Sequence, residues 1–231
     1  MLFAPYERYQ YARAPLVEVI CQLRFPTILS IGAKEPAEFQ EAIRKDFPQY
    51  AARQEQLPPK VVKKGNATAL ESQKPITNYN FISEDGRWKL NLTQGFIALS
   101  TLSYTRWEDF ATRLDRPLAQ FIQLYQPAFF ERIGLRYVNA VSRQRLGLEG
   151  ELWDDLIRSQ YIGILGEPDV EESEIAKCSL DVETPLVGDY RMKLHAGPGL
   201  IGGGKLLQSF TLKQSYNNIM KNNLQKTRKK S

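Results

Sequence analysis

The sequence contains few of the residues on which metal and redox sites depend. It has one histidine, His195, and two cysteines, Cys21 and Cys178, among its 231 residues. A single histidine excludes any site that needs two histidine ligands, and the two cysteines lack the spacing of zinc ligands. Because two distant cysteines at apolar strand positions are typical of reduced proteins, we expect buried thiols and not a disulfide. We predict no cofactor and no metal.

Other familiar signatures are also missing. The chain has no Walker-type phosphate loop and no G-x-S-x-G nucleophile elbow. Its glycine-rich segment, residues 197–204, lacks the strand-to-helix context of a phosphate-binding loop and is interpreted as a flexible hairpin loop. No apolar run approaches the roughly 20 residues that cross a bilayer, and the N-terminus has neither the basic nor the apolar region of a signal peptide. A cytoplasmic protein without a membrane partner is expected.

The net charge of +5 is a property of the C-terminal segment. Seven of the 31 Lys and Arg residues lie in residues 205–231, which contain no acidic residue. Residues 1–204 therefore hold 24 basic and 26 acidic side chains. A duplex-binding surface neutralises several phosphates with clustered cations, and the body of the chain has no such excess. A local basic face is compatible with this balance.

The most regular pattern is a three-strand meander followed by a helix, within residues 79–125. Asp85-Gly86 and Gln94-Gly95 separate runs in which apolar and polar residues alternate, and Asp-Gly favours the type I′ turn of a tight hairpin. Two-residue turns would place Phe81 opposite Leu90. One face of the meander is then apolar and the other polar. This fixes the register, because a slip of one residue would mix the two faces.

The helix that follows is expected to start at Thr105. Thr105 and Glu108 match a capping box, in which both side chains accept hydrogen bonds from unpaired backbone amides. Apolar residues then recur at helical spacing along one stripe, which most simply packs on the apolar face of the meander. Pro117 lies inside this segment and should kink the helix or split it in two.

The remaining segments have weaker patterns. Residues 54–64 are interpreted as a connection with a weak edge-strand pattern at Val61-Val62, and residues 164–173 as an acidic loop. Further strands are expected at 15–25, 129–141, 175–186, 190–196 and 206–212, and further helices at 36–50 and 148–161.

This order of elements predicts an α+β fold. A strand–helix–antiparallel meander–helix unit is followed by a similar but shorter one, so we predict a pseudo-duplicated fold in which antiparallel sheets are packed by helices. The expected boundaries are 1–126 for the first unit, 127–204 for the second and 205–231 for a basic polar tail. The order resembles the repeated unit of TATA-binding-protein-like folds, which is an analogy of fold and not of function.

Charged residues gather on the strand that opens the second unit. Arg132 and Arg136 share one phase of this strand, and Glu131 and Asn139 lie beside them. Glu18 and Arg24 lie on the expected strand at 15–25. Together they would form a charged stripe on an open sheet face. A guanidinium group forms two parallel hydrogen bonds to a carboxylate and stacks on planar groups, so the stripe is the candidate binding surface for an acidic or planar partner. Cross-strand salt bridges in an ordinary sheet would explain the same residues.

No catalytic residue is predicted. His195 lies on the polar phase of its strand, where it is either a solitary acid or base or an ordinary half-exposed histidine. Paired carboxylates occur at Glu84-Asp85, Asp154-Asp155 and Glu171-Glu172. These pairs fall in a turn, on a helix surface and in a loop, and none of these contexts gives the enclosure that separates two carboxyl pKa values.

Two segments are distinctive as sequence motifs. Residues 11–25 contain Ala14-Pro-Leu-Val-Glu18, and residues 130–139 contain Glu131-Arg-Ile-Gly-Leu-Arg-Tyr137. They resemble the signature segments of a family of uncharacterised, sporadically distributed bacterial proteins that is defined only by sequence, and the similarity runs from about Tyr6 to about Gly199. The resemblance implies no established activity, cofactor or catalytic residue. The family's patchy occurrence implies an accessory or mobile gene, linked to conflict with phage or plasmids.

The resemblance also implies a further apolar strand and an amphipathic helix near the C-terminus. Residues 209–231 are instead rich in Lys, Asn and Gln. A genuine basic arm, a truncation and an out-of-frame ending would each explain this departure.

The leading hypothesis is a non-catalytic cytoplasmic binding protein, with a protein partner favoured. One alternative is a nucleic-acid-binding protein that uses a sheet face and the basic tail. The other is a small-ligand or hydrolytic site between sheet and helices, lined by His195 or by the region of Glu131 and Arg136.

Overall fold

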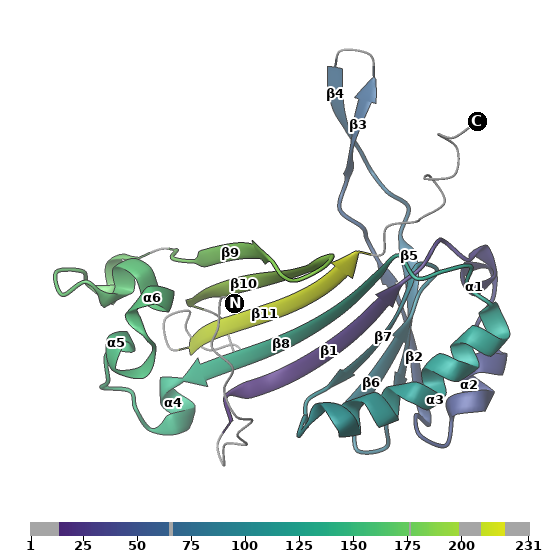
Figure 1. Ribbon diagram of the computed structural model, residues 1–231, viewed down its shortest axis with the longest axis horizontal. Coiled ribbons are helices and arrows are strands. Elements are labelled where there is room, and N and C mark those ends of the chain that lie inside the picture. Colours follow the sequence, from purple (N-terminus) through teal and green to yellow (C-terminus); the bar gives the residue numbers. More distant parts are fainter. Residues whose placement is uncertain (1–13, 65–66, 176, 199–208, 220–231) are drawn as a thin grey trace. The chain divides into compact units, whose positions relative to one another are not determined.

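The computed structural model describes residues 14–64, 67–175, 177–198 and 209–219. It confirms the α+β class with an antiparallel sheet (Figure 1). The described residues form two compact units, which we call the helix-covered unit (22–101 and 106–133) and the open-sheet unit (14–21, 102–105 and 134–219). The division falls inside strands β1 (Leu16–Arg24) and β8 (Arg132–Ser142), so each strand contributes residues to both units.

The helix-covered unit contains the predicted meander. Its strands pair in the order β2-β5-β6-β7. Phe81 lies opposite Leu90, and Leu90 lies opposite Leu99, as predicted. The register is therefore confirmed. The type I′ turn expected at Asp85-Gly86 is wrong, because Gly86 has a positive φ but Asp85 does not, and the Gly86 amide donates to the Ser83 carbonyl at 3.0 Å. The elements of this unit are α1 (Leu29–Ala33), α2 (Ala37–Ile43), β2 (Gln49–Glu55), β3 (Lys60–Lys64), β4 (Ala67–Glu71), β5 (Ile76–Ile82), β6 (Trp88–Leu92), β7 (Phe96–Thr101) and α3 (Trp107–Tyr125).

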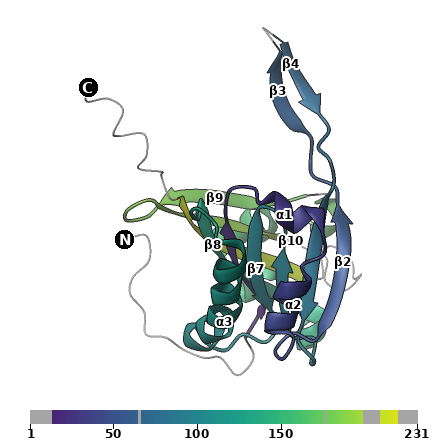
Figure 2. The same cartoon turned by 90° about the vertical axis from the view of Figure 1, so that its right-hand side faces the viewer.

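Helices α2 and α3 pack on the apolar face of this sheet (Figure 2). Phe39 of α2 meets Phe81 of β5 with ring centroids 5.5 Å apart, and Phe121 of α3 meets Phe25 at 4.8 Å. All four rings are at most 2% exposed. Burying such large apolar side chains is the main favourable term in folding, so this layer is the core of the unit.

Helix α3 differs from its prediction at both points of detail. It runs unbroken from Trp107 to Tyr125 with Pro117 inside it, so the expected split is wrong. Pro117 is buried in the packed face, and this packing offsets the backbone hydrogen bond that proline removes. The helix also begins one residue later than expected, because its N-cap is Arg106, which has an extended backbone and makes no side-chain cap. The capping box of Thr105 and Glu108 stays a prediction.

Residues 44–71 contain more strand than the sequence suggests. The helix expected over residues 36–50 ends at Ile43, and β2 begins at Gln49 and pairs with β5 along its whole length. The expected connection at residues 54–64 includes the end of β2 and all of β3, which pairs with β4. Cross-strand pairing therefore overrides the weak local pattern of these polar segments.

The open-sheet unit orders its strands β8-β11-β10-β9. Its small core joins Trp153, Ile162, Leu165, Ala196 and Phe210. The elements after β8 are α4 (Arg143–Leu146), α5 (Trp153–Leu156), α6 (Ser159–Ile162), the 3-10 helices η1 (Gly163–Gly166) and η2 (Glu172–Glu174), β9 (Leu180–Pro185), β10 (Tyr190–Pro198) and β11 (Ser209–Ile219).

Two expectations for this unit need correction. The helix predicted over residues 148–161 is two short helices, because the chain becomes extended at Ile157 and Arg158. The last strand, β11, extends to Ile219 and pairs with β10, so residues 209–219 belong to the sheet and not to a polar tail. The rest of the expected tail lies outside the described residues. Internal duplication stays a prediction.

The two cysteines are unpaired, as expected. Cys21 is buried, and its burial raises the pKa of the thiol to about 11. Because the thiolate is the reactive form, this cysteine is chemically quiet near neutral pH. None of the described helices is long and apolar enough to cross a membrane.

Candidate functional site

A shallow groove of about 500 Å³ lies on one face of the β8-β11-β10-β9 sheet. We call it the sheet groove. Its lining combines three strictly cationic side chains, one histidine, two carboxylates and one hydroxyl with two aliphatic residues. These residues are Arg136, Asp181, Val182, Glu183, Lys193, Leu194, His195, Lys213 and Ser215.

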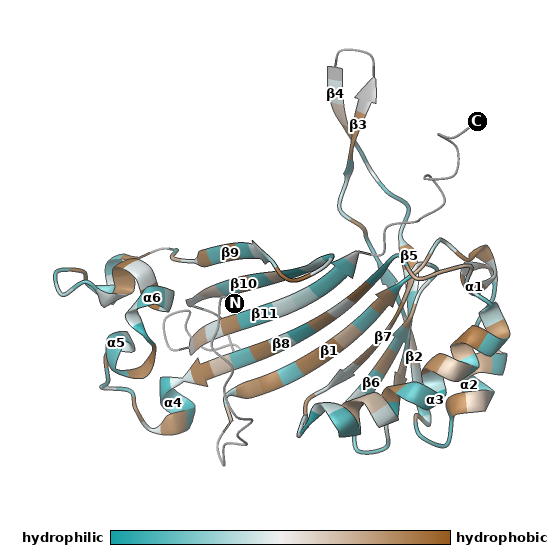
Figure 3. Cartoon of the chain, in the orientation of Figure 1, coloured by the Kyte–Doolittle hydropathy of each residue, from teal (hydrophilic) through white to brown (hydrophobic). Residues whose placement is uncertain are grey.

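Strand alternation places these polar groups on one face. Along β10, Met192, Leu194 and Ala196 are buried, whereas Lys193 is exposed and His195 is half-exposed. Successive side chains of a strand point to opposite faces, so the buried set faces the core and the polar set faces the groove. Strand β8 combines hydrophilic and hydrophobic residues (Figure 3), and Arg136 is its one exposed residue.

The strand register arranges the groove in two rows. His195 lies opposite Asp181 on β9 and opposite Lys213 on β11. Lys193 lies opposite Glu183 on β9 and opposite Ser215 on β11. Directly opposed side chains are close enough to interact, so each row crosses three strands, with its carboxylate on β9.

The two carboxylates of the groove already have cationic partners. The Nδ1 atom of His195 is 2.7 Å from Oδ1 of Asp181. The Nζ atom of Lys193 and the Nη1 atom of Arg191 are 2.8 Å and 3.2 Å from the Glu183 carboxylate. Hydrogen bonds from Lys193 and Arg191 hold the pKa of Glu183 below its ordinary value. Both acids are therefore fixed on the β9 side of the groove.

Two cationic side chains in the groove are not matched by an acid. Arg136 donates from Nε to the Ser215 hydroxyl at 3.1 Å, a contact that orients the guanidinium without neutralising it. Neither Arg136 nor Lys213 makes an ion pair within the described part of the chain. The groove therefore has an uncompensated positive side along β8 and β11.

His195 and Asp181 have the geometry of a histidine oriented by a carboxylate, which is one half of a nucleophilic triad. The nearest groove hydroxyl, that of Ser215, is bonded to Arg136 and makes no hydrogen bond to His195. The His195 and Asp181 side chains are 41% and 70% exposed. This pair is open to water, and among the residues that the structure describes His195 makes no hydrogen bond to a hydroxyl or thiol.

Five residues of the predicted charged stripe are not gathered in one site. Arg24, Glu131 and Arg132 belong to the helix-covered unit, where the Arg132 guanidinium bonds the Gln22 side chain and the Glu131 amide donates to the Arg24 carbonyl at 2.8 Å. In the open-sheet unit, Asn139 is 3.5 Å from the Leu212 carbonyl. Asn139 and Arg136 lie on opposite faces of β8, because their positions differ by an odd number. Only Arg136 of the five lines the sheet groove.

Most of the groove residues were not predicted as site residues from the sequence. Lys213 and Ser215 were assigned to the tail because the length of β11 was underestimated. Asp181, Glu183 and Lys193 occupy polar positions in two segments whose apolar and polar residues alternate. The Gly188-Asp189 turn between these segments predicts a hairpin, which would have brought the three residues together. A hairpin with fixed register pairs Asp181 with His195.

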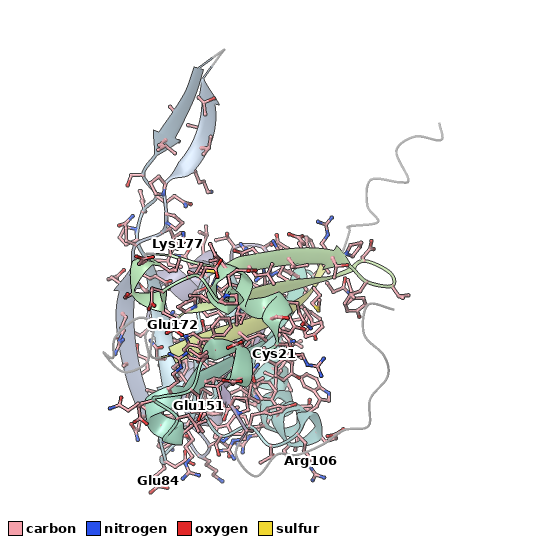
Figure 4. All side chains as sticks on the ribbon, turned by 90° about the vertical axis from the view of Figure 1, so that its left-hand side faces the viewer. Cys21, Glu84, Arg106, Glu151, Glu172 and Lys177 are labelled. Carbon is pink, nitrogen blue, oxygen red and sulfur yellow. The ribbon has the colours of Figure 1, made fainter. Side chains whose placement is uncertain are left out.

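A second feature of the open-sheet unit is a cavity of about 580 Å³, which we call the acidic cavity. At its edge Arg143 donates two hydrogen bonds, of 2.8 Å and 2.6 Å, to the Glu172 carboxylate. The Arg143 guanidinium also lies 4.1 Å from the centre of the buried Trp153 ring. Glu172 and Glu151 are labelled in Figure 4. The lining of the acidic cavity combines charged and apolar side chains, and includes Arg143, Glu149, Glu151, Leu152, Asp154, Leu165, Glu167, Pro168, Val170, Glu171 and Glu172.

The acidic cavity has a strong excess of negative charge. Apart from Glu172, none of its acidic side chains has an ion-pair partner among the residues that the structure describes. The same residues contain no group of His, Cys, Asp and Glu side chains arranged to hold a metal ion. The cavity is therefore a negatively charged surface without metal-binding geometry.

No family model matches the chain, and no curated protein is significantly similar to it. The function is therefore inferred from the geometry of the two units.

Proposed function

We propose that this protein is a non-catalytic, cytoplasmic binding protein that holds an acidic segment of a partner protein in the sheet groove. The observation that supports this most is the mismatch of charges in the groove. Asp181 and Glu183 are already paired, whereas Arg136 and Lys213 have no acid partner in the described chain. Carboxylates supplied by a partner would pair with Arg136 and Lys213.

An acidic peptide fits this groove better than a nucleic acid does. Among the residues that the structure places, no Phe, Tyr or Trp lines the groove, whereas single-stranded nucleic acids are held largely by stacking on aromatic side chains. The fixed carboxylates of Asp181 and Glu183 would also repel a phosphate backbone that crossed the strands. A peptide can place carboxylates along β8 and β11 alone, and there the Arg136 guanidinium can form two parallel hydrogen bonds to one of them.

The proposal is tested by fluorescence anisotropy with a fluorescein-labelled octaglutamate peptide and the full-length chain. The variant Arg136→Ala/Lys213→Ala should weaken binding by about fivefold, as expected for the loss of two exposed ionic contacts. The charge reversal Arg136→Glu/Lys213→Glu should abolish it. Binding by the natural protein should also weaken as NaCl rises from about 50 to about 300 mM, because exposed charges are screened.

A matched control removes two positive charges elsewhere. Arg44 and Lys45 are exposed in the helix-covered unit, and Arg44→Ala/Lys45→Ala should bind the peptide as the natural protein does. Equal weakening by both double variants would mean that only net charge matters, and it would overturn the proposal. So would tighter binding of a labelled oligothymidine of the same length, provided that the groove variants weaken it.

A further inference from the structure

The helix-covered unit has a hairpin that is not part of its main sheet. Strands β3 and β4 pair only with each other (Figure 1). The base of the hairpin is held by two glutamines. Gln56 donates to the Gln73 carbonyl at 2.6 Å, and Gln73 donates to the Pro58 carbonyl at 2.5 Å. The hairpin is therefore anchored at its base, and no third strand of the described ranges pairs with it.

This hairpin exposes an apolar pair. Val61 lies directly opposite Leu70, so both side chains are on the same face. They are 66% and 72% exposed, which places them among the most exposed large apolar residues of the described chain. Figure 3 shows hydrophobic colouring on the hairpin strands. An isolated two-stranded hairpin is at best marginally stable in water, and a contiguous exposed apolar face is typical of an interaction surface.

The charge of the hairpin is opposite to that of the acidic cavity. Residues 60–71 contain three lysines and one glutamate, and Lys60 has no ion-pair partner in the part of the chain that the structure describes. The acidic cavity offers unpaired carboxylates such as Glu151. It also offers apolar contacts, since Leu152 lines it and is 61% exposed.

We propose that the β3–β4 hairpin of one copy of this protein docks into the acidic cavity of a second copy. Val61 and Leu70 would pack against Leu152, while Lys60 meets the carboxylates around Glu151. The contact joins two different surfaces, the hairpin of one copy and the cavity of the other, so each copy supplies one of each. A single hairpin gives an interface below the roughly 1,200–2,000 Å² of stable complexes, so the association should be reversible and concentration-dependent.

Sedimentation velocity over a range of concentrations tests this with the full-length chain. The natural protein should self-associate, and Val61→Asp should make it monomeric at every concentration. Val187 is 90% exposed in the turn between β9 and β10, so Val187→Asp is the matched control and should self-associate normally. Unchanged circular dichroism would show that Val61→Asp preserves the fold.

A charge exchange identifies the surface on which the hairpin docks. Lys60→Glu and Glu151→Lys should each weaken self-association, because each variant on its own pairs like charges. An equimolar mixture of the two variants should restore a complex, since the hairpin of each copy then meets a cavity of opposite charge on the other. A monomeric natural protein would overturn the proposal. Self-association that survives Val61→Asp, or a mixture of charge variants that stays monomeric, would also overturn it.

Discussion

The two units cover their sheets in different ways. In the helix-covered unit, α2 and α3 bury one face under rings such as Phe39 and Phe121. In the open-sheet unit, the core gathers around Trp153, and one face of β8-β11-β10-β9 presents charged side chains to water. The first arrangement uses its residues for stability. The second leaves ionic groups available, which is why both candidate binding surfaces with an excess of charge lie there.

The largest effect should come from breaking the aromatic layer of the helix-covered unit. Phe121 is fully buried and contacts the rings of Phe25 and Tyr125. Phe121→Ala should lower the free energy of unfolding by about 3–5 kcal/mol, because it loses apolar burial and leaves a cavity. Urea denaturation followed by circular dichroism measures this loss.

A second substitution on the same helix is the control for Phe121. Leu124 is 36% exposed, so Leu124→Ala should cost less than about 1 kcal/mol. Equal losses for the two variants would contradict the assignment of the core to this layer.

A smaller effect is expected in the open-sheet unit, where one ion pair supports the core. Arg143 joins the Glu172 carboxylate and the face of Trp153. The Glu172 side chain is 25% exposed, so removing its partner should cost less than the full penalty of a buried charge. We expect about 2 kcal/mol for Arg143→Ala.

The conservative variant separates charge from geometry at this position. Arg143→Lys keeps the charge but loses the two parallel hydrogen bonds, so it should recover only part of the stability in the same urea titration. Full recovery of the free energy of unfolding by Arg143→Lys would show that the two parallel hydrogen bonds of the guanidinium group are unimportant for stability.

The contrast between the units also explains what could be predicted from the sequence. The meander was predictable in register because turn residues separate its strands and the apolar alternation permits only one pairing. The type of the first turn was not predictable in the same way, because the Gly86 amide bonds back to the Ser83 carbonyl. The core of the helix-covered unit followed from the same pattern together with the apolar stripe of α3. Local information is sufficient when neighbours in the sheet are neighbours in the sequence.

The sheet groove was not predictable in the same way. Arg136 was identified as a candidate, but its bonding partner Ser215 lies 79 positions away. The two meet only because β11 pairs between β8 and β10, and no local pattern reports that strand order. His195 was noted as an isolated residue, since its partner Asp181 depends on the register of a hairpin whose first strand, β9, is shorter than its alternating pattern suggests.

The claim that the sheet groove is the binding surface is tested most directly by nuclear magnetic resonance of the ¹⁵N-labelled protein titrated with octaglutamate. The amide shifts of Arg136, Lys213 and Ser215, and those of their neighbours on β10, should change in a saturable manner. Shifts in the helix-covered unit at α2 and α3 should stay constant. Saturable changes confined to α2 and α3, or no saturable change in β8, β10 and β11, would contradict the account.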